Sequence, residues 1–303
     1  MNIKIGNAPC SWGTLEFEGM GKPIPYNQML DELRESGYQG TELGDWGYFP
    51  TDSSKLCEEL SNRGLELLGA FVPVGLKYSA NHDDGLKNAL KIASFQREVA
   101  KKMKSQTNPF LVLSDNNGTD PIRTQFAGKI TKDMELAPKE WKTFCFGADL
   151  IAKAVFEETG LKTVFHHHCA GFVETPSEID QLLENTDPKY LGLVLDTGHY
   201  SFGRNSQGPS LLEALDRYKD RLWYLHLKGF KPIGGTSNYF ESIAKGIFCE
   251  LSDGEINFKE VLDWLNRKNY QGWALVEQDI LPGMGSPKKS AQKNFDYLKS
   301  IGF

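Results

Sequence analysis

Short apolar runs alternate with amphipathic stretches along the whole chain. Each run has the length of a strand buried on both faces, and the segment after it repeats its apolar positions with a helical period. The predicted strands are Ile3–Ala8, Gly40–Leu43, Glu66–Val72, Phe110–Ser114, Thr163–His166, Leu191–Asp196, Leu222–Leu227 and Ala274–Glu277. The predicted helices are Tyr26–Ser36, Ser54–Arg63, Asp84–Lys104, Pro138–Thr159, Pro176–Glu184, Ser210–Lys219, Phe258–Lys268 and Pro287–Ser300.

Eight strand–helix pairs in succession predict a (β/α)8 TIM barrel, an α/β fold that we expect to form a single domain over residues 1–303. A doubly wound sheet would need a glycine-rich phosphate turn after the first strand, and Asn7–Gly13 does not supply one. Two inserts, Asp115–Ala137 and Gly229–Asn257, follow strands four and seven at the carboxyl face. Long segments at that face are predicted to contact substrate or to act as lids.

The composition of the chain limits the kinds of partner and the cellular compartment that we expect. The net charge of −6 offers no basic stripe, so we expect no nucleic acid partner. No run of about 18 apolar residues is present, so we expect no membrane span. The five cysteines are scattered without a C-x-x-C pair, and the first residues lack an apolar signal core, which favours a cytoplasmic protein. A homo-oligomer is compatible with the sequence, although no segment requires one.

Three of the apolar runs end in residues of the types that commonly bind metal ions. Asp196, His226 and Glu277 terminate strands six, seven and eight. Consecutive strand ends are neighbours in a barrel, so these side chains are predicted to converge. Their mixed oxygen and nitrogen donors suit Mn²⁺, Co²⁺, Fe²⁺, Mg²⁺ or Zn²⁺, and the absence of cysteine ligands argues against a structural zinc.

The fifth strand ends in three consecutive histidines. Neighbouring side chains on an extended segment point to opposite faces, so His166 and His168 can share one side while His167 faces away. One of the first pair would complete the metal shell, and the other would contact substrate or metal. We take His166 as the ligand and His168 as the residue at the substrate. Glu174, on the following loop, is a candidate for an extra acid, although a carboxylate before a helix is more often solvated or capping.

Five other side chains follow strands one, two, six and seven and are candidates for substrate contact or acid–base work: Trp12, Glu42, Trp46, His199 and Lys228. The lysine could place a positive charge near a substrate oxygen, and Trp46 together with Tyr48 and Phe49 could form a wall for a sugar-like ring. The histidine could turn back over the site. Each of the five also fits ordinary loop packing.

Six phrases of the sequence resemble the xylose-isomerase-like barrel superfamily of sugar isomerases and epimerases, and within it the inosose dehydratases: Asn7–Gly13, Gly40–Gly44, His166–His168, Leu195–His199, His226–Lys228 and Val276–Asp279. Members of the superfamily bind one divalent ion through Glu, Asp, His and Glu at the ends of strands five to eight. Carried over to this chain, the last three are Asp196, His226 and Glu277. The first glutamate is absent, and the histidine run occupies its place.

The resemblance implies a metal-dependent lyase of inositol catabolism, with Mn²⁺ or Co²⁺ expected first, that removes water from a keto-cyclitol such as 2-keto-myo-inositol through an enediolate. Glu277 or a histidine of the 166–168 run would accept the proton, and His199 or His168 would donate one to the departing hydroxyl. The missing glutamate is one of the pair that a symmetrical epimerase uses. The alternatives are a ketose epimerase or isomerase, a 3-keto-glycoside lyase and, least favoured, a non-catalytic sugar-binding barrel.

Overall fold

The computed structural model describes residues 3–14, 24–204, 208–281 and 283–303. Eight parallel strands close into a barrel in the order β1-β10-β7-β6-β5-β4-β3-β2. Their bounds are Ile3–Asn7 (β1), Gly40–Glu42 (β2), Glu66–Pro73 (β3), Phe110–Ser114 (β4), Thr163–His166 (β5), Leu191–Asp196 (β6), Leu222–Leu227 (β7) and Gly272–Val276 (β10). The predicted barrel is confirmed, and the predicted strands differ from these only at their ends.

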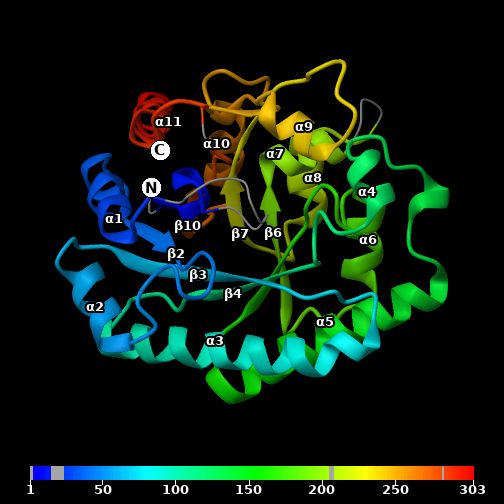
Figure 1. Ribbon diagram of the computed structural model, residues 1–303, viewed down its shortest axis with the longest axis horizontal. Helices are drawn as coiled ribbons and strands as arrows, with labels where there is room; N and C mark the ends of the chain where they lie inside the picture. The colour runs from blue at the N-terminus through cyan, green and yellow to red at the C-terminus, as the bar shows by residue number, and fades with distance from the viewer. Residues whose placement is uncertain (1–2, 15–23, 205–207, 282) are drawn as a thin grey trace.

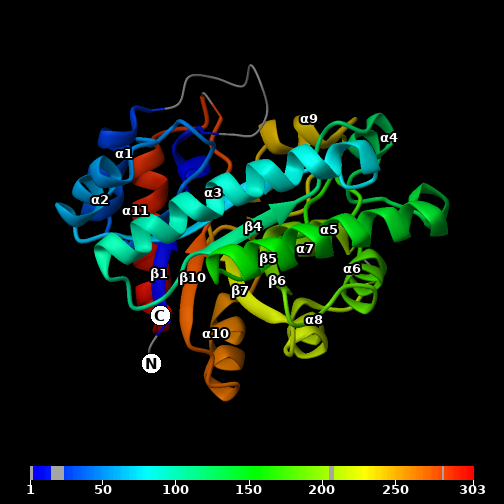
Figure 2. The same ribbon diagram turned by 90° about the horizontal axis from the view of Figure 1, so that it is seen from below.

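Helices surround the barrel on the outside (Figure 1). The eight that were predicted are Tyr26–Glu35 (α1), Ser53–Ser61 (α2), His82–Met103 (α3), Pro138–Thr159 (α5), Pro176–Glu184 (α6), Leu211–Tyr218 (α8), Phe258–Arg267 (α10) and Pro287–Ile301 (α11). The two longest, α3 and α5, lie side by side across the same part of the barrel (Figure 2). None of the helices in the described ranges is long and apolar enough to cross a membrane.

Two apolar layers hold the barrel together. The larger lies between the strands and the helices. The smaller fills the inside of the barrel and includes Val164, Val194, Tyr224 and Leu275, one from each of β5, β6, β7 and β10. Side chains two residues apart on a strand share a face. The next inward position on each of these strands is therefore at its carboxyl end, where the barrel opens.

The inserts build a cap over one side of that opening. The segment after β4 contains α4 (Pro121–Gln125), and the segment after β7 contains α9 (Tyr239–Ala244) and an antiparallel pair, β8 (Gly229–Phe230) with β9 (Phe248–Cys249). Helices α4 and α9 contact each other at the same end of the molecule in both views (Figures 1 and 2). A third apolar cluster joins the inserts to the loop after β5. The short elements of this cap were not predicted, because none spans enough residues to show a period.

Candidate metal centre and its cavity

Four side chains from consecutive strands of the barrel meet at its carboxyl end: His166, Asp196, His226 and Glu277. Each occupies the inward position two residues after one of the apolar residues that fill the barrel. One potential ligand atom from each lies within 4.8 Å of the others. The structure thus brings together the four residues that the sequence proposed as metal ligands.

One carboxylate oxygen of Asp196 caps a helix, and the other faces the candidate metal site. Oδ1 accepts a hydrogen bond of 2.7 Å from the backbone N–H of His199, which makes Asp196 the N-cap of the short helix α7 (Thr197–Gly203). Oδ2 faces the site, 3.9 Å from Nε2 of His166. Burial raises the pKa of Asp196 to about 7. A nearby cation would keep this carboxylate ionised.

His226 is held between two carboxylates. Its Nε2 lies 3.2 Å from Oε1 of Glu42, and its Nδ1 lies 3.2 Å from Oε1 of Glu277. Burial lowers the pKa of His226, but the charges of these two carboxylates outweigh it and raise the pKa to about 10. If Nε2–H is donated to Glu42, Nδ1 is left for the site. A carboxylate behind a ligating imidazole is the arrangement that fixes its orientation.

The residues fit a divalent metal ion. His166 Nδ1 and Asp196 Oδ2 are buried and make no hydrogen bond. Buried polar atoms without partners are rare in folded proteins, because each loses its hydration without compensation. Here two of them belong to a cluster of two imidazoles and two carboxylates, a donor set that Mn²⁺, Co²⁺, Fe²⁺ and Zn²⁺ accept.

Lys228 supplies the positive charge beside this cluster. Its Nζ lies 3.1 Å from Oδ1 of Asp279, 3.3 Å from Oε2 of Glu277 and 3.3 Å from Nε2 of His199. Burial lowers the pKa of Lys228, but the two carboxylates raise it well above its usual range, so the side chain is an ammonium. Its stem runs against Gly198, where an added Cβ would lie 2.7 Å from Lys228 Cγ.

The remaining histidines take different roles. His168 lines the cavity, and its Nδ1 lies 2.6 Å from the carbonyl of Cys169, so Nδ1 carries the proton and Nε2 is the basic nitrogen. Burial and the charge of Lys228 lower the pKa of His168 to about 3. His199 packs against it, with ring centroids 3.8 Å apart. His167 points away from the barrel axis toward Tyr200, and its Nε2 accepts the backbone N–H of Asp196 at 3.1 Å.

A cavity opens in front of these groups, and Glu42, His166, His168, Lys228 and Glu277 form part of its wall. The rest of the wall includes Ala8, Pro9 and Cys10 after β1, Gly44 and Asp45 after β2, and Phe71 near the end of β3. Sequence reasoning missed Asp279 and Phe71. Asp279 could have been found from strand parity, because it lies two residues after Glu277, but parity along β3 does not single out Phe71.

The two tryptophans proposed to contact substrate lie elsewhere. Trp12 is fully buried, and its Nε1 donates to Oε2 of Glu32 on α1 at 2.8 Å. Trp46 packs edge-on against Phe95 of α3, with Lys91 4.4 Å above its ring. Neither is among the described residues that line the cavity. The chain segments that contain the two tryptophans do line the cavity, but they do so with smaller residues such as Cys10 and Gly44.

A closed barrel that gathers imidazole and carboxylate groups at the carboxyl ends of its strands defines a class of barrel enzymes that perform their chemistry at that face. The family model described as the xylose isomerase-like TIM barrel matches residues 19–301. The chain belongs to this family, and it is an enzyme. The resemblance inferred from the motifs is confirmed.

Relatives match over nearly the whole chain. The inosose dehydratase of Lactiplantibacillus plantarum is 32% identical, covering 98% of this chain and 96% of its own length. The inosose dehydratase of Salmonella typhimurium is 30% identical, covering 99% and 96%. Among solved structures, the IOLI protein with a bound zinc atom superimposes with a TM-score of 0.70 at 13% identity, covering 99% of this chain and 98% of that one, which shows the shared fold.

Proposed function

We propose that this protein is a dehydratase, dependent on a divalent metal ion, that removes water from a keto-cyclitol such as 2-keto-myo-inositol. The observation that carries the proposal is the buried cluster of two imidazoles and two carboxylates that opens into a cavity beside the Lys228 ammonium. The inosose dehydratases that match the chain end to end support the choice of substrate. A small polyhydroxylated ketone is the class of partner that such a polar, enclosed site accepts.

His166, Asp196, His226 and Glu277 would hold the ion. It would supply Lewis-acid polarisation of the substrate ketone, which makes the neighbouring C–H bond more acidic. Mn²⁺ and Co²⁺ are the ions we expect first, and Fe²⁺, Zn²⁺ and Mg²⁺ are compatible with the same donors. The Lys228 ammonium lies beside Glu277 at the cavity wall, where it can hold an oxygen of the substrate on which negative charge develops.

We assign proton transfer to His168. It is the imidazole on the cavity wall outside the metal cluster, and its proton on Nδ1 leaves Nε2 as the acceptor. Nε2 takes the proton next to the ketone, and the C–H electron pair forms an enolate. The enolate then expels the hydroxyl group one carbon further on, which leaves as water with the proton from the His168 imidazolium. The ring of His199 packs against that of His168 at an angle of 37° and restricts its movement.

Glu277 is the other proton acceptor to test. Both of its oxygens already face cations or ligands, with Oε1 3.2 Å from His226 Nδ1 and Oε2 3.3 Å from Lys228 Nζ. We therefore favour Glu277 as a metal ligand and His168 as the base. His168→Gln separates the two assignments, because it removes the proposed base and leaves all four ligands in place.

The experiment compares EDTA-stripped protein with protein reloaded with Mn²⁺ or Co²⁺, using 2-keto-myo-inositol and the ultraviolet absorbance of the dione product. We expect dione to form only with the ion. His168→Gln should lower kcat by about 10²–10⁴-fold while metal affinity is retained. His82→Gln is the matched control, because this buried histidine bonds the carbonyl of Leu76 outside the cluster. Metal-dependent epimerisation without loss of water would support the isomerase alternative and reject the dehydratase.

A further inference from the structure

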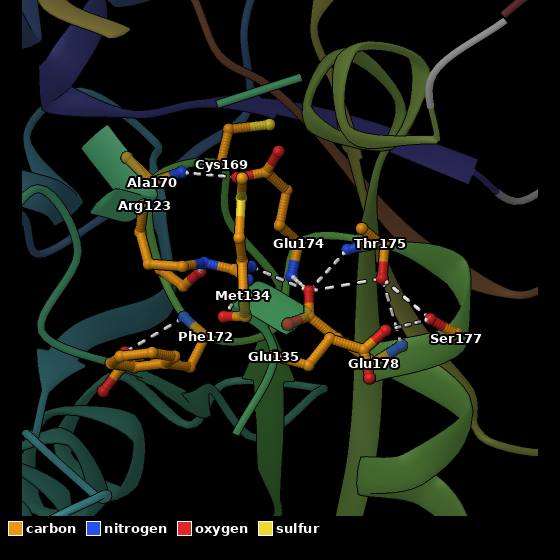
Figure 3. Close-up of polar contacts among 12 residues, drawn as sticks. Arg123, Met134, Glu135, Cys169, Ala170, Phe172, Glu174, Thr175, Ser177 and Glu178 are labelled. Carbon is orange, nitrogen blue, oxygen red and sulfur yellow. Dashed lines mark hydrogen bonds and ion pairs between the residues drawn. The ribbon is translucent and has the colours of Figure 1, made fainter. Parts of the chain in front are cut away.

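A buried ionic cluster outside the candidate metal centre is built around Arg123 and Glu178 (Figure 3). Arg123 on α4 donates from Nη2 to Oε2 of Glu178 on α6 at 2.8 Å, and neither side chain is exposed to solvent. A charged pair that has left water entirely is expensive unless its hydrogen bonds are complete. This pair joins the insert after β4 to the helix after β5.

The guanidinium group of Arg123 makes three further contacts besides its ion pair with Glu178. Nε donates to the carbonyl of Gly171 at 2.7 Å, Nη1 donates to the carbonyl of Met134 at 3.4 Å, and the Phe172 ring lies 5.5 Å from the guanidinium carbon. Figure 3 shows Arg123 extending from one side of the cluster toward Glu178, with Met134 and Phe172 beside it. One side chain therefore connects the insert, α6 and the loop between β5 and α6.

The buried carboxylate of Glu174 also binds the loop between β5 and α6, through a backbone N–H group. Its Oε1 accepts the backbone N–H of Gly128 at 2.6 Å, and its Oε2 accepts that of Ala170 at 2.8 Å. Ala170 has φ of 64°, a left-handed conformation that an alanine adopts only when its surroundings hold it there. The expectation that Glu174 is solvated or caps α6 is wrong: it is fully buried, and the capping box is formed by Thr175 and Glu178.

The loop held in this way carries His168. The backbone N–H of His168 donates to the carbonyl of Val173 at 3.0 Å, and the N–H of Gly171 donates to the carbonyl of His168 at 3.3 Å. Residues 166–175 are all buried. The carbonyl that Arg123 binds thus belongs to the residue whose N–H fixes the backbone of His168.

We propose that Arg123 is a positioning residue that acts through Gly171 to hold His168 at the cavity. The inference rests on the proposed function, because it takes His168 as the proton-transfer group. It gives the insert after β4 a role in catalysis although no residue of α4 lines the cavity among those described. The metal ligands should be independent of it, because they lie at strand ends that are held by the barrel itself.

Removing Arg123 alone would strand the Glu178 carboxylate in the interior, so the informative variant is Arg123→Met with Glu178→Gln. The glutamine oxygen can still accept the backbone N–H groups of Glu174 and Thr175, which Glu178 accepts at 3.0 and 2.9 Å. Glu178→Gln alone keeps the bond from Arg123 to Gly171, and the buried Glu174 carboxylate still balances the guanidinium charge, so this variant serves as the first control.

The second control is Arg221→Lys. Arg221 also spans segments by donating to backbone carbonyls, those of Leu191 at 2.9 Å and Leu183 at 2.8 Å, but it does so at the opposite end of the barrel. We expect the double variant to lower kcat roughly 10²-fold, as a displacement of about 1 Å does, with KM and Mn²⁺ affinity within threefold of wild type. Both controls should keep wild-type kcat.

Two further measurements separate positioning from general stability. Hydrogen exchange should show lost protection over residues 168–175 and unchanged protection over residues 191–196 in the double variant. In a His168→Gln background, the double variant should cause almost no further loss of kcat, because the residue through which Arg123 acts is already gone.

Several outcomes would overturn the inference: wild-type kcat in the double variant, an equal loss in Arg221→Lys, a loss of Mn²⁺ affinity together with kcat, or full additivity with His168→Gln. If the wild-type protein forms no dione, the proposed function fails, and hydrogen exchange still decides whether Arg123 holds the loop. Unchanged protection over residues 168–175 would then reject the positioning role by itself.

Discussion

Replacing Gly198 by alanine should lower turnover while leaving the fold and the metal site intact. Gly198 lies in the first turn of α7, and a Cβ there would lie 2.7 Å from Cγ and 2.9 Å from Cβ of Lys228. Ordinary contact between such atoms is about 3.5–4.0 Å, so the lysine stem must move by roughly 1 Å. Its Nζ would then leave the point where it is held by Asp279, Glu277 and His199.

The variant should affect both kcat and the free energy of unfolding, and the magnitude of each can be worked out separately. A displacement of about 1 Å at a reacting group lowers kcat by about 10²-fold, which we take as the upper end for this variant. Alanine is favoured over glycine in a helix by about 1 kcal/mol, and the overpacking against Lys228 costs about 1–3 kcal/mol. The free energy of unfolding should therefore fall by about 0–2 kcal/mol, while kcat falls by about 10- to 100-fold.

The assay measures kcat with the ketone substrate, Mn²⁺ affinity by calorimetry and the free energy of unfolding in urea. Ser201→Ala is the matched control, because it places the same residue on the same helix, where Ser201 contacts only the carbonyl of Thr197 through its hydroxyl. Wild-type kcat in Gly198→Ala would refute the role given to Lys228. Loss of Mn²⁺ affinity in this variant would show that the change had spread into the metal site.

Three other predictions test the site and the barrel. Chelation should lower the unfolding midpoint, and an ion at 100 times its Kd should restore about 2.7 kcal/mol of stability, measured by thermal unfolding with EDTA or Mn²⁺; equal midpoints would reject the metal site. Asp196→Asn should keep the cap on His199 N–H and so the fold, but lower Mn²⁺ affinity at least tenfold in calorimetry, unless Asp196 is not a ligand. Leu275→Ala, at a fully buried position inside the barrel, should cost about 2–5 kcal/mol in urea unfolding; a loss below about 1 kcal/mol would contradict the packing described.

Much of the barrel could be predicted from the sequence because its strands are buried on both faces. Such strands read as continuous apolar runs, and their carboxyl ends are marked by the first polar residue. Asp196 and His226 ended their runs in this way, and the structure brings them together with His166 and Glu277. Alternation along the strand also separated His167, which turns to Tyr200, from its two neighbours.

The features that were not predicted depend on contacts that leave no local pattern in the sequence. Trp12 and Trp46 were proposed because their segments follow strands, but the direction of a side chain on an irregular loop is set by packing, and both pack on helices. The ion pair between Arg123 and Glu178 joins segments far apart in the chain. Helix α7 was missed because its N-cap is the same aspartate that was assigned to the metal.

The spread of the four ligands along the chain has a consequence for biosynthesis. His166, Asp196 and His226 come from β5, β6 and β7, and Glu277 directly follows β10, the last of the eight barrel strands along the chain and the one that closes the barrel against β1. A nascent chain that stops short of β10 presents three of the four groups on an open sheet, where water can reach them. If the four groups bind an ion as we propose, tight capture coincides with barrel closure, and truncated chains would hold metal less tightly than the closed barrel.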